Sequence, residues 1–197
     1  MSSDNFTCIG PRDILAYVHG DLRAATRSVF LIGPWLDGYV AQKMVAVAPR
    51  TLNVRVLVRV EHHQDPIARN RTATALSIFA GHWTDFEARA LERLHAKCLC
   101  IDGRIVYVGS ANWYQYSLEQ ALEVVLRGPV EAIMGLDEVL EKLWGQGELL
   151  KVSGEVGETG NQVAPGITYE VLDPLATEML KQNPKAFVLG RKKRDIS

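Results

Sequence analysis

The stretch of sequence that decides the fold runs from His95 to Glu123 and reads HAKCLCIDGRIVYVGSANWYQYSLEQALE. Its apolar residues predict two strands, at 94–101 and 105–108, joined through Asp102-Gly103. Asp-Gly is a strong signal for a tight β-hairpin, because both residues tolerate the positive φ angles of the turn. The two strands are therefore expected to pair side by side, with polar side chains at their open end.

Helix-like and strand-like segments alternate on both sides of this hairpin. Further strands are predicted at 28–32, 53–60, 86–91 and 122–126, and helices at 14–22, 40–47, 66–80 and 130–143. The strands are short apolar or β-branched runs, whereas the helices repeat apolar residues every three or four positions. This alternation predicts an α/β fold, with a mixed β-sheet flanked by helices on both faces.

The composition is that of a soluble globular protein. Hydrophobic residues make up 47% of the 197 residues and charged residues 23%, which excludes disordered and collagen-like classes. No apolar run approaches the ~18 residues of a membrane span, and the N-terminus lacks the pattern of a secretory signal. The three cysteines have no framework spacing and suit a reducing compartment. We therefore expect a cytoplasmic protein without membrane insertion.

The hairpin carries the residues on which chemistry can be built. His95 and Lys97 lie two positions apart on a predicted strand, so their side chains emerge on the same face. The paired strand ends at Gly109-Ser110, where glycine permits close approach of the backbone to a ligand, and Asn112 adds uncharged donors. Together with a carboxylate at Glu123, this set suits an anionic phosphate ester whose charge grows in the transition state.

The spacing H-x-K-x4-D-x6-G-S-x-N resembles the signature of the phospholipase D superfamily. Its fixed positions are filled by His95, Lys97, Asp102, Gly109, Ser110 and Asn112. The segment from Ser117 to Glu123 is similar to the family stretch that carries a glutamate shortly after the signature. The resemblance covers roughly residues 11–144 and implies a phospholipase-D-like fold.

The resemblance implies a role for each residue of the signature. His95 would attack phosphorus and form a phosphohistidine, while a second histidine protonates the leaving oxygen. Lys97 and Asn112 would bind the non-bridging oxygens, with support from Ser110. The reaction would then be two in-line displacements that need no metal and no other cofactor.

Other residues of the segment have supporting roles. Glu123 would accept the Nδ1 proton of His95 and so set its tautomer, although Glu119 is a rival for this role. Asp102 and Gly109 form the structural part of the signature. Trp113 and Tyr114 directly follow the signature, where they either line the substrate entrance or pack into the core.

Larger family members carry two copies of the signature in one active site, but this chain has one. None of the other histidines has lysine two residues later: His19, His62, His63 and His82. A single copy implies a two-fold homodimer in which each chain supplies half of the site, as in the small bacterial endonuclease of this family. Cys98 and Cys100 share the predicted strand face opposite His95, so they are expected to lie in the core. A zinc site at these two cysteines is disfavoured, because Cys-x-Cys on a strand lacks the usual turn geometry.

The end of the chain differs in composition from the rest. Residues 152–166 are rich in Gly, Glu and Ser and predict a loop, whereas Asp173-Pro174 favours the start of a short helix. The chain then ends on the basic run Arg191–Arg194. We therefore expect a phospholipase-D-like catalytic domain at residues 1–148 and an extension at 149–197.

Three functions are compatible with these features. The favoured one is a nuclease, because the chain is small and basic residues outnumber acidic ones eight to four between Asp21 and Arg71. A phospholipase or other lipid phosphodiesterase would need an apolar platform near the site, which the sequence does not show. A non-catalytic nucleic-acid-binding module would not need a nucleophile. The expected partners are thus a second copy of the chain and DNA or RNA.

Overall fold

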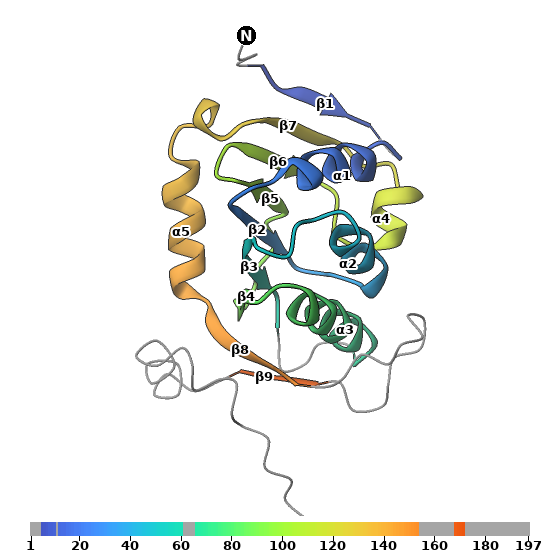
Figure 1. The fold of residues 1–197 in the computed structure, drawn as a ribbon, viewed down its shortest axis with the longest axis vertical. Helices are drawn as coiled ribbons and strands as arrows, with labels where there is room; N and C mark the ends of the chain where they lie inside the picture. Colours follow the sequence, from blue (N-terminus) through green and yellow to red (C-terminus); the bar gives the residue numbers. More distant parts are fainter. Residues whose placement is uncertain (1–4, 11, 61–65, 154–167, 172–197) are drawn as a thin grey trace, which may run out of the picture.

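The computed structural model describes residues 5–10, 12–60, 66–153 and 168–171. The strands are β1 (Thr7–Ile9), β2 (Ser28–Gly33), β3 (Asn53–Val58), β4 (Asp85–Ala90), β5 (Cys98–Ile101), β6 (Ile105–Gly109), β7 (Val125–Pro129), β8 (Glu148–Ser153) and β9 (Thr168–Val171). The helices are α1 (Ile14–Ala24), α2 (Gly38–Val45), α3 (Pro66–His82), α4 (Gln115–Glu119) and α5 (Leu136–Gln146), with a 3-10 turn at Val130–Ala132. Figure 1 shows how these elements are arranged.

Within these residues the strands form one nine-stranded sheet, in the order β1-β7-β6-β5-β2-β3-β4-β8-β9. β2, β3 and β4 run parallel to one another, whereas the other neighbouring strands pair antiparallel. The central strand β2 is buried from Val29 to Gly33, which explains its continuous apolar sequence. The predicted mixed sheet of an α/β fold is confirmed.

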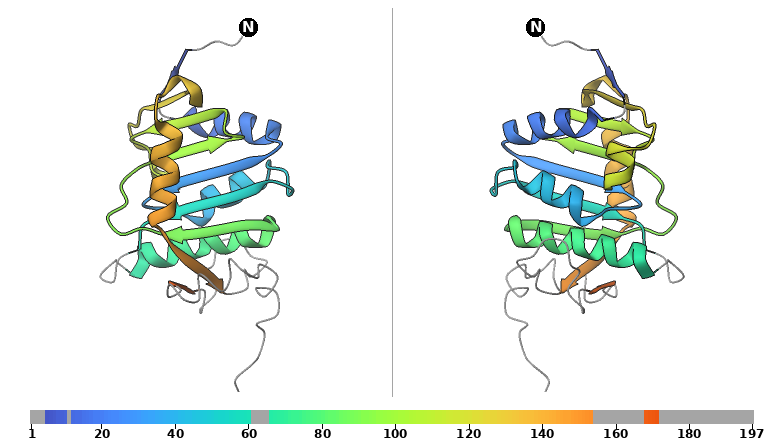
Figure 2. Two further views of the ribbon diagram at one scale, coloured as in Figure 1. Left: turned by 90° about the vertical axis from the view of Figure 1, so that its left-hand side faces the viewer. Right: turned by 90° about the vertical axis from the view of Figure 1, so that its right-hand side faces the viewer.

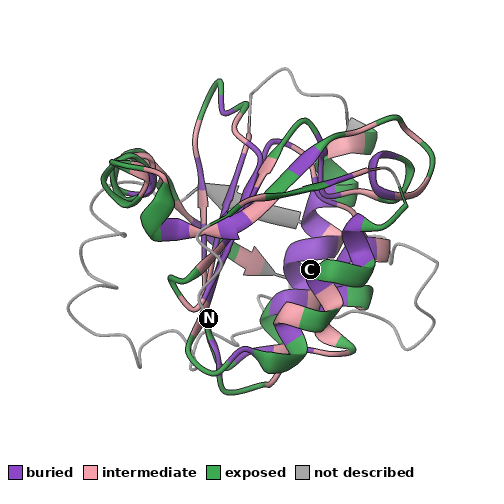
Figure 3. Ribbon diagram, turned by 90° about the horizontal axis from the view of Figure 1, so that it is seen from above, coloured by how far each residue is buried: buried purple, intermediate pink, exposed green. Residues whose placement is uncertain are grey.

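Helices cover both faces of this sheet. α1, α2 and α3 pack on one face and α5 crosses the other, with the buried residues concentrated between the layers (Figures 2 and 3). The core on the α1–α3 side includes Leu22 and Leu76, and the core under α5 includes Phe30 and Trp144. No helix among the described residues is long and apolar enough to cross a membrane.

Two arginines of the sheet bind residues of α5. The Arg55 guanidinium lies 4.3 Å from the centroid of Phe30 and is 2.6 Å from a carboxylate oxygen of Glu141 on the helix. The Arg89 guanidinium lies 4.5 Å from the Trp144 ring and donates to the Trp144 carbonyl oxygen at 3.0 Å. Stacking of a guanidinium on an aromatic ring adds to the attraction of the ion pair. The place of α5 on the sheet is therefore set by contacts with β3 and β4.

The hairpin between β5 and β6 turns where the sequence predicts. Asp102 and Gly103 have φ angles of 57° and 64°, and the Arg104 N–H donates to the Ile101 carbonyl oxygen at 3.0 Å, which closes a tight turn. The strands pair Ile101 with Ile105, so Arg104 is also part of the connection. The Asp102 carboxylate accepts hydrogen bonds from the backbone N–H groups of Thr26, Arg27 and Ser28 at 2.8 to 3.2 Å. Burial raises the pKa of this carboxyl, but the backbone donors outweigh burial and hold the pKa below its usual value. Asp102 thus joins the hairpin to the start of β2.

Several predicted boundaries are wrong. Residues 94–97 lie outside β5, because the pairing with β2 begins only at Cys98. The strand expected at 122–126 is β7 at Val125–Pro129, where it pairs with β6. The helix expected at 130–143 is divided into a 3-10 turn and α5 by Gly135, whose φ is 77°. The strands β1, β8 and β9 and the short helix α4 were not predicted from the sequence.

The sheet continues into the C-terminal part of the chain. β8 pairs with β4 and with β9, so the expected loop cannot begin at Val152, which lies in β8. The expected boundary after residue 148 falls inside the same strand. The predicted helix at Asp173 and the basic run Arg191–Arg194 lie outside the described residues.

Candidate active site

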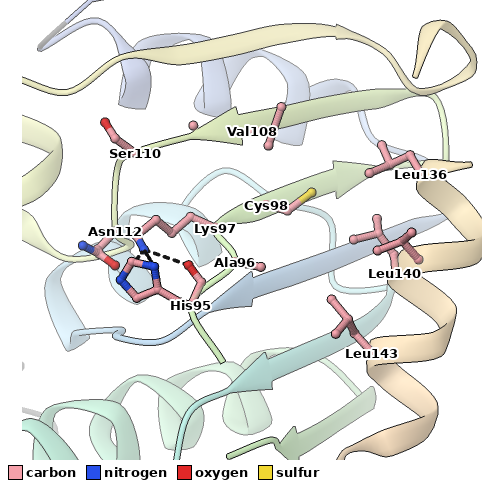
Figure 4. A pocket seen from close by; sticks show the side chains of 12 residues that line it. His95, Ala96, Lys97, Cys98, Val108, Ser110, Asn112, Leu136, Leu140 and Leu143 are labelled. Carbon is pink, nitrogen blue, oxygen red and sulfur yellow. Dashed lines mark hydrogen bonds between the residues drawn. The ribbon is translucent and has the colours of Figure 1, made fainter. Parts of the chain in front are cut away.

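The two halves of the signature meet at one edge of the sheet (Figure 4). Because β5 and β6 pair antiparallel, the residues before β5 emerge beside the residues after β6. His95 and Lys97 precede β5, whereas Ser110 and Asn112 follow β6, and all four line the same groove. The structure therefore brings together the four signature side chains that could contact a substrate.

The Lys97 ammonium lies against the imidazole of His95. Its Nζ is 3.3 Å from Nε2 and 3.4 Å from Nδ1 of the ring, and it donates to the His95 carbonyl oxygen at 2.8 Å. His95 is exposed, whereas Lys97 is only 9% exposed. Burial lowers the pKa of Lys97, and the charge of Glu123 opposes this shift. A phosphate oxygen beside the ring would thus meet a fixed positive charge.

The Glu123 carboxylate is held by two serine hydroxyls. Ser110 Oγ donates to Oε2 at 2.5 Å, and Ser117 Oγ donates to Oε1 at 2.6 Å. Ser117 also accepts a hydrogen bond from the Asn112 backbone N–H at 2.8 Å. Among the described residues, no hydrogen bond joins Glu123 to His95. Glu123 is thus connected to Ser110 directly and to the Asn112 backbone through Ser117.

Glycine at position 109 makes this connection possible. A Cβ atom there would lie 2.2 Å from the carbonyl oxygen of Val124, a separation that no side chain tolerates. The close approach lets the Ser110 N–H donate to the same oxygen at 3.1 Å. Gly109 therefore allows Ser110, which follows β6, to contact Val124, which follows Glu123.

The rival carboxylate, Glu119, has different neighbours. It lies on α4 and accepts hydrogen bonds from the Tyr39 hydroxyl and, at 3.1 Å, from Gln115 Nε2. These donors lower the pKa of Glu119, and the contact with Glu119 raises the pKa of Tyr39 to about 12. The carboxylate that bonds to a signature side chain is therefore Glu123.

Asn112 presents an unused polar group. The residue is 8% exposed and lines the groove, yet its Oδ1 has no hydrogen-bond partner in the described part of the chain. A buried polar atom without a partner costs free energy. The oxygen and nitrogen of a carboxamide have nearly the same shape, so the group can offer either an acceptor or a donor to a ligand.

The groove beside these residues has a volume of about 570 Å³. His95, Lys97, Ser110 and Asn112 form its polar end (Figure 4). Apolar side chains form the opposite wall, and four of them come from α5: Leu136, Val139, Leu140 and Leu143. The groove therefore has a polar end, formed by signature residues, and an apolar wall.

Comparison with known proteins identifies the family. The family model described as "Cardiolipin synthase, PLD-like domain" matches residues 19–144. The chain belongs to the phospholipase D superfamily. Members of this superfamily hydrolyse phosphodiester bonds. The groove beside His95 is therefore the candidate phosphodiesterase site. No curated protein matches the chain.

Solved structures with the phospholipase D fold resemble this chain. NucT from Helicobacter pylori has a TM-score of 0.60 at 20% identity over 73% of this chain and 97% of its own. Nuc from Salmonella typhimurium, a phospholipase D family member, has a TM-score of 0.60 at 14% identity over 74% and 98%. The phosphatidylserine synthase of Haemophilus influenzae Rd KW20 has a TM-score of 0.56 at 13% identity over 93% and 46%.

In this phospholipase D superfamily member, Trp113 does not line the entrance. It is 2% exposed, and its Nε1 donates to the Ile32 carbonyl oxygen at 2.9 Å. Its ring fills the space beside Gly33, where a Cβ would come within 2.5 Å of Cδ1. Tyr114 is half-buried at the start of α4 and is not among the residues that line the groove. Trp113 is therefore a core residue, contrary to the entrance role considered from the sequence.

The cysteines of β5 are buried, as the sequence predicts. The Sγ atoms of Cys98 and Cys100 are 3.9 Å apart, and a hydrogen bond between the thiols together with burial raises the pKa of Cys98. Cys98 also lines the groove with His95, so the expectation that it faces away from His95 is wrong. The reason is that the alternation of β5 does not extend to residues 94–97.

His95 is the only imidazole on the groove within the described residues. His82 bonds a backbone carbonyl oxygen at 3.1 Å, and burial, with two neighbouring cations, lowers the pKa of His19. These two lie on α3 and α1, across the sheet from α5. His62 and His63 lie outside the described residues, which hold no group of three potential metal ligands.

Two features of the site were missed from the sequence. Ser117 was noted only as part of the segment that carries Glu123, although a serine early in a helix after the signature is well placed to bond backwards along the chain. The sequence predicts a helix with apolar residues at 130–143, but it does not predict that apolar residues of α5 line the groove. Neither Ser117 nor the apolar residues of α5 belong to the fixed positions of the signature.

Proposed function

We propose that this protein is a metal-independent nuclease, a phosphodiesterase that works through a phosphohistidine at a homodimer interface. The observation that carries the proposal is the position of Lys97, 3.3 Å from Nε2 of His95, with Ser110 and Asn112 on the same groove. An imidazole beside a fixed cation and neutral donors fits the charge that develops on a phosphodiester under attack.

The reaction would proceed in two displacements. In the first, His95 Nε2 bonds to phosphorus while the bond to the leaving oxygen breaks, and a second imidazole gives that oxygen its proton. In the second, water attacks phosphorus, passes a proton to the second imidazole and releases His95. Lys97 and Asn112 would bind the non-bridging oxygens, and Glu123 would orient an imidazole through Nδ1.

A homodimer supplies the second imidazole. One imidazole cannot be both nucleophile and acid in the same displacement, because attack needs Nε2 unprotonated and acid catalysis needs it protonated. A two-fold axis beside His95 would bring two copies together. This arrangement agrees with the single imidazole on the described groove.

Exposed apolar side chains in the segments near the site support this assembly. Leu122 is 92% exposed, and Tyr116, Val124 and Leu126 are also exposed. Leu126 pairs across strands with Val108, which lines the groove. Large apolar side chains that are exposed in one subunit are often buried at a subunit interface.

The apolar wall of α5 favours a second candidate, a lipid phosphodiesterase. Val139 is 55% exposed on the groove, and the neighbouring Asp137 and Glu138 are exposed acids that would repel a polyanion. An acyl chain would bury such a wall at a gain of about 25 cal/mol per Å². The phosphate chemistry at His95 is the same for both substrates.

The test compares three substrates, each with and without chelator: a labelled single-stranded oligonucleotide, phosphatidylglycerol vesicles and a bis-aryl phosphodiester. The nuclease proposal expects cleavage of the oligonucleotide that survives chelation and is lost in His95→Asn. Cleavage of the vesicle lipid alone would replace it by the lipid candidate. Binding of the oligonucleotide without cleavage of any substrate would indicate the non-catalytic module.

A charge on the α5 wall separates the two substrates further. Val139→Lys adds a cation to the groove, whereas Met134→Lys adds one at a 98% exposed residue that does not line it. For a nuclease, Val139→Lys should lower KM for the oligonucleotide more than Met134→Lys does. For a lipid enzyme, it should lower the rate on vesicles, because the charge must be desolvated.

A further inference from the structure

We infer that Ser117 is a positioning residue that couples the orienting carboxylate, Glu123, to the phosphate-binding Asn112. Ser117 lies on α4 and is 1% exposed. Its hydroxyl donates to Glu123 Oε1 at 2.6 Å and accepts the Asn112 backbone N–H at 2.8 Å. The inference rests on the proposed function, because it assigns a role within the same site.

The two hydrogen bonds of Ser117 depend on each other. A hydroxyl has one proton to donate, and the Asn112 N–H occupies one of its acceptor positions. The proton of Ser117 is therefore directed to Glu123. Since the residue is buried, water has little access to replace either bond.

Ser110 holds the other carboxylate oxygen in a different environment. It is exposed, and its Oγ accepts from the Val124 N–H at 3.2 Å while it donates to Glu123 at 2.5 Å. Ser110 thus ties Glu123 to the strand that follows it. Ser117 ties the same carboxylate to the backbone that carries the Asn112 side chain.

Removal of the Ser117 hydroxyl should affect both partners. The Asn112 N–H would be left buried without an acceptor, and one oxygen of Glu123 would lose its donor. If the free energy lost with a hydrogen bond to a charged group is added to the reaction barrier, the rate falls by about ten- to a hundredfold. We expect Ser117→Ala to lower kcat by this factor.

The matched control is Ser77→Ala. Ser77 is also a buried serine in a helix, α3, but its hydroxyl has no hydrogen-bond partner among the described residues. Hydrolysis of a bis-aryl phosphodiester is measured for both variants, alone and combined with Glu123→Gln. If Ser117 acts through Glu123, Ser117→Ala should cost far less in the Glu123→Gln background. Ser77→Ala should leave kcat unchanged in both.

Other outcomes overturn the inference. An unchanged kcat in Ser117→Ala, or the same loss in both backgrounds, shows that Ser117 does not act through Glu123. Should Ser117→Ala not fold by circular dichroism, Ser117→Cys keeps the volume with a weaker donor. Its kcat should then lie below that of the wild type, and a wild-type kcat would refute the coupling.

Failure of the proposed function gives a different result. In that case the wild-type protein hydrolyses no phosphodiester, and Ser117 is tested by the affinity for tungstate, a phosphate-shaped oxyanion, in calorimetry. Displacement of Asn112 in Ser117→Ala should weaken tungstate binding by about threefold or more, whereas Ser77→Ala should not. An unchanged affinity in Ser117→Ala refutes the coupling independently of catalysis.

Discussion

Replacement of Gly109 by alanine tests whether the contact between the end of β6 and the segment before β7 positions the site. A Cβ at residue 109 would lie 2.2 Å from Val124 O and 2.8 Å from Val125 Cα. Both atoms belong to the backbone, so no side-chain rotation relieves the overlap. Non-bonded atoms prefer separations of about 3.5 Å, so the two segments must move apart by about 1 Å.

This movement is large enough to break the local hydrogen bonds. The Ser110 N–H donates to Val124 O at 3.1 Å, and the Val124 N–H donates to Ser110 Oγ at 3.2 Å. A further separation of about 1 Å takes both beyond hydrogen-bond range. We expect a loss of about 1–3 kcal/mol in the free energy of unfolding from overpacking. Misplacement of catalytic groups by this distance lowers kcat by about a hundredfold.

The assay combines urea denaturation with hydrolysis of a bis-aryl phosphodiester. Gly20→Ala is the control, because Gly20 lies within α1 and nothing is within 4 Å of its added Cβ. That variant should be more stable by about 0.5–1 kcal/mol, since alanine favours a helix over glycine. A Gly109→Ala protein with wild-type stability and wild-type kcat would refute the assigned role of the close approach.

Three further predictions follow from charges and assembly. Glu123→Gln removes the charge that opposes the burial-induced fall in the pKa of Lys97, so the alkaline limit of kcat/KM should move to lower pH; an unmoved limit would contradict the coupling of these two groups. The pKa of Asp102 is depressed in the folded state, so its stabilising effect is present above its unfolded pKa and is lost as pH falls through its folded pKa. Asp102→Asn should therefore lose about 1–2 kcal/mol of unfolding free energy at pH 7, and urea midpoints of the two proteins should converge in acid. Wild-type and His95→Asn chains refolded together in equal amounts should retain about a quarter of the activity of an all-wild-type sample, whereas retention of half would show that each chain works alone.

Local rules were sufficient for the hairpin and for the central strands. The turn at Asp102-Gly103 follows from backbone preferences of two adjacent residues, and β2 and β3 follow from apolar and β-branched runs. Antiparallel pairing then places the residues before β5 beside those after β6. For this reason the groove residues His95, Lys97, Ser110 and Asn112 could be named from the sequence and its family resemblance.

Contacts between distant segments decided the rest. Trp113 follows the signature directly, but it is buried because Gly33, eighty residues earlier in the chain, leaves room for its ring. The wall of the groove comes from α5, which Arg55 and Arg89 hold from β3 and β4. Periodicity shows that a helix has an apolar side, but it does not show which strand or groove that side will face.

The hydrogen bonds that link Asn112 through Ser117 to Glu123 also depend partly on local sequence and partly on tertiary contacts. The sequence by itself determined the residue types and the hairpin that presents them, since these depend on neighbours within a few positions. Only the tertiary structure decided that a short helix, α4, folds back so that one hydroxyl meets both partners. The direction of such a return depends on the packing of α4 and on the close approach at Gly109. Sequence periodicity does not predict either of these contacts, because each contact joins segments that do not belong to the same helix or strand.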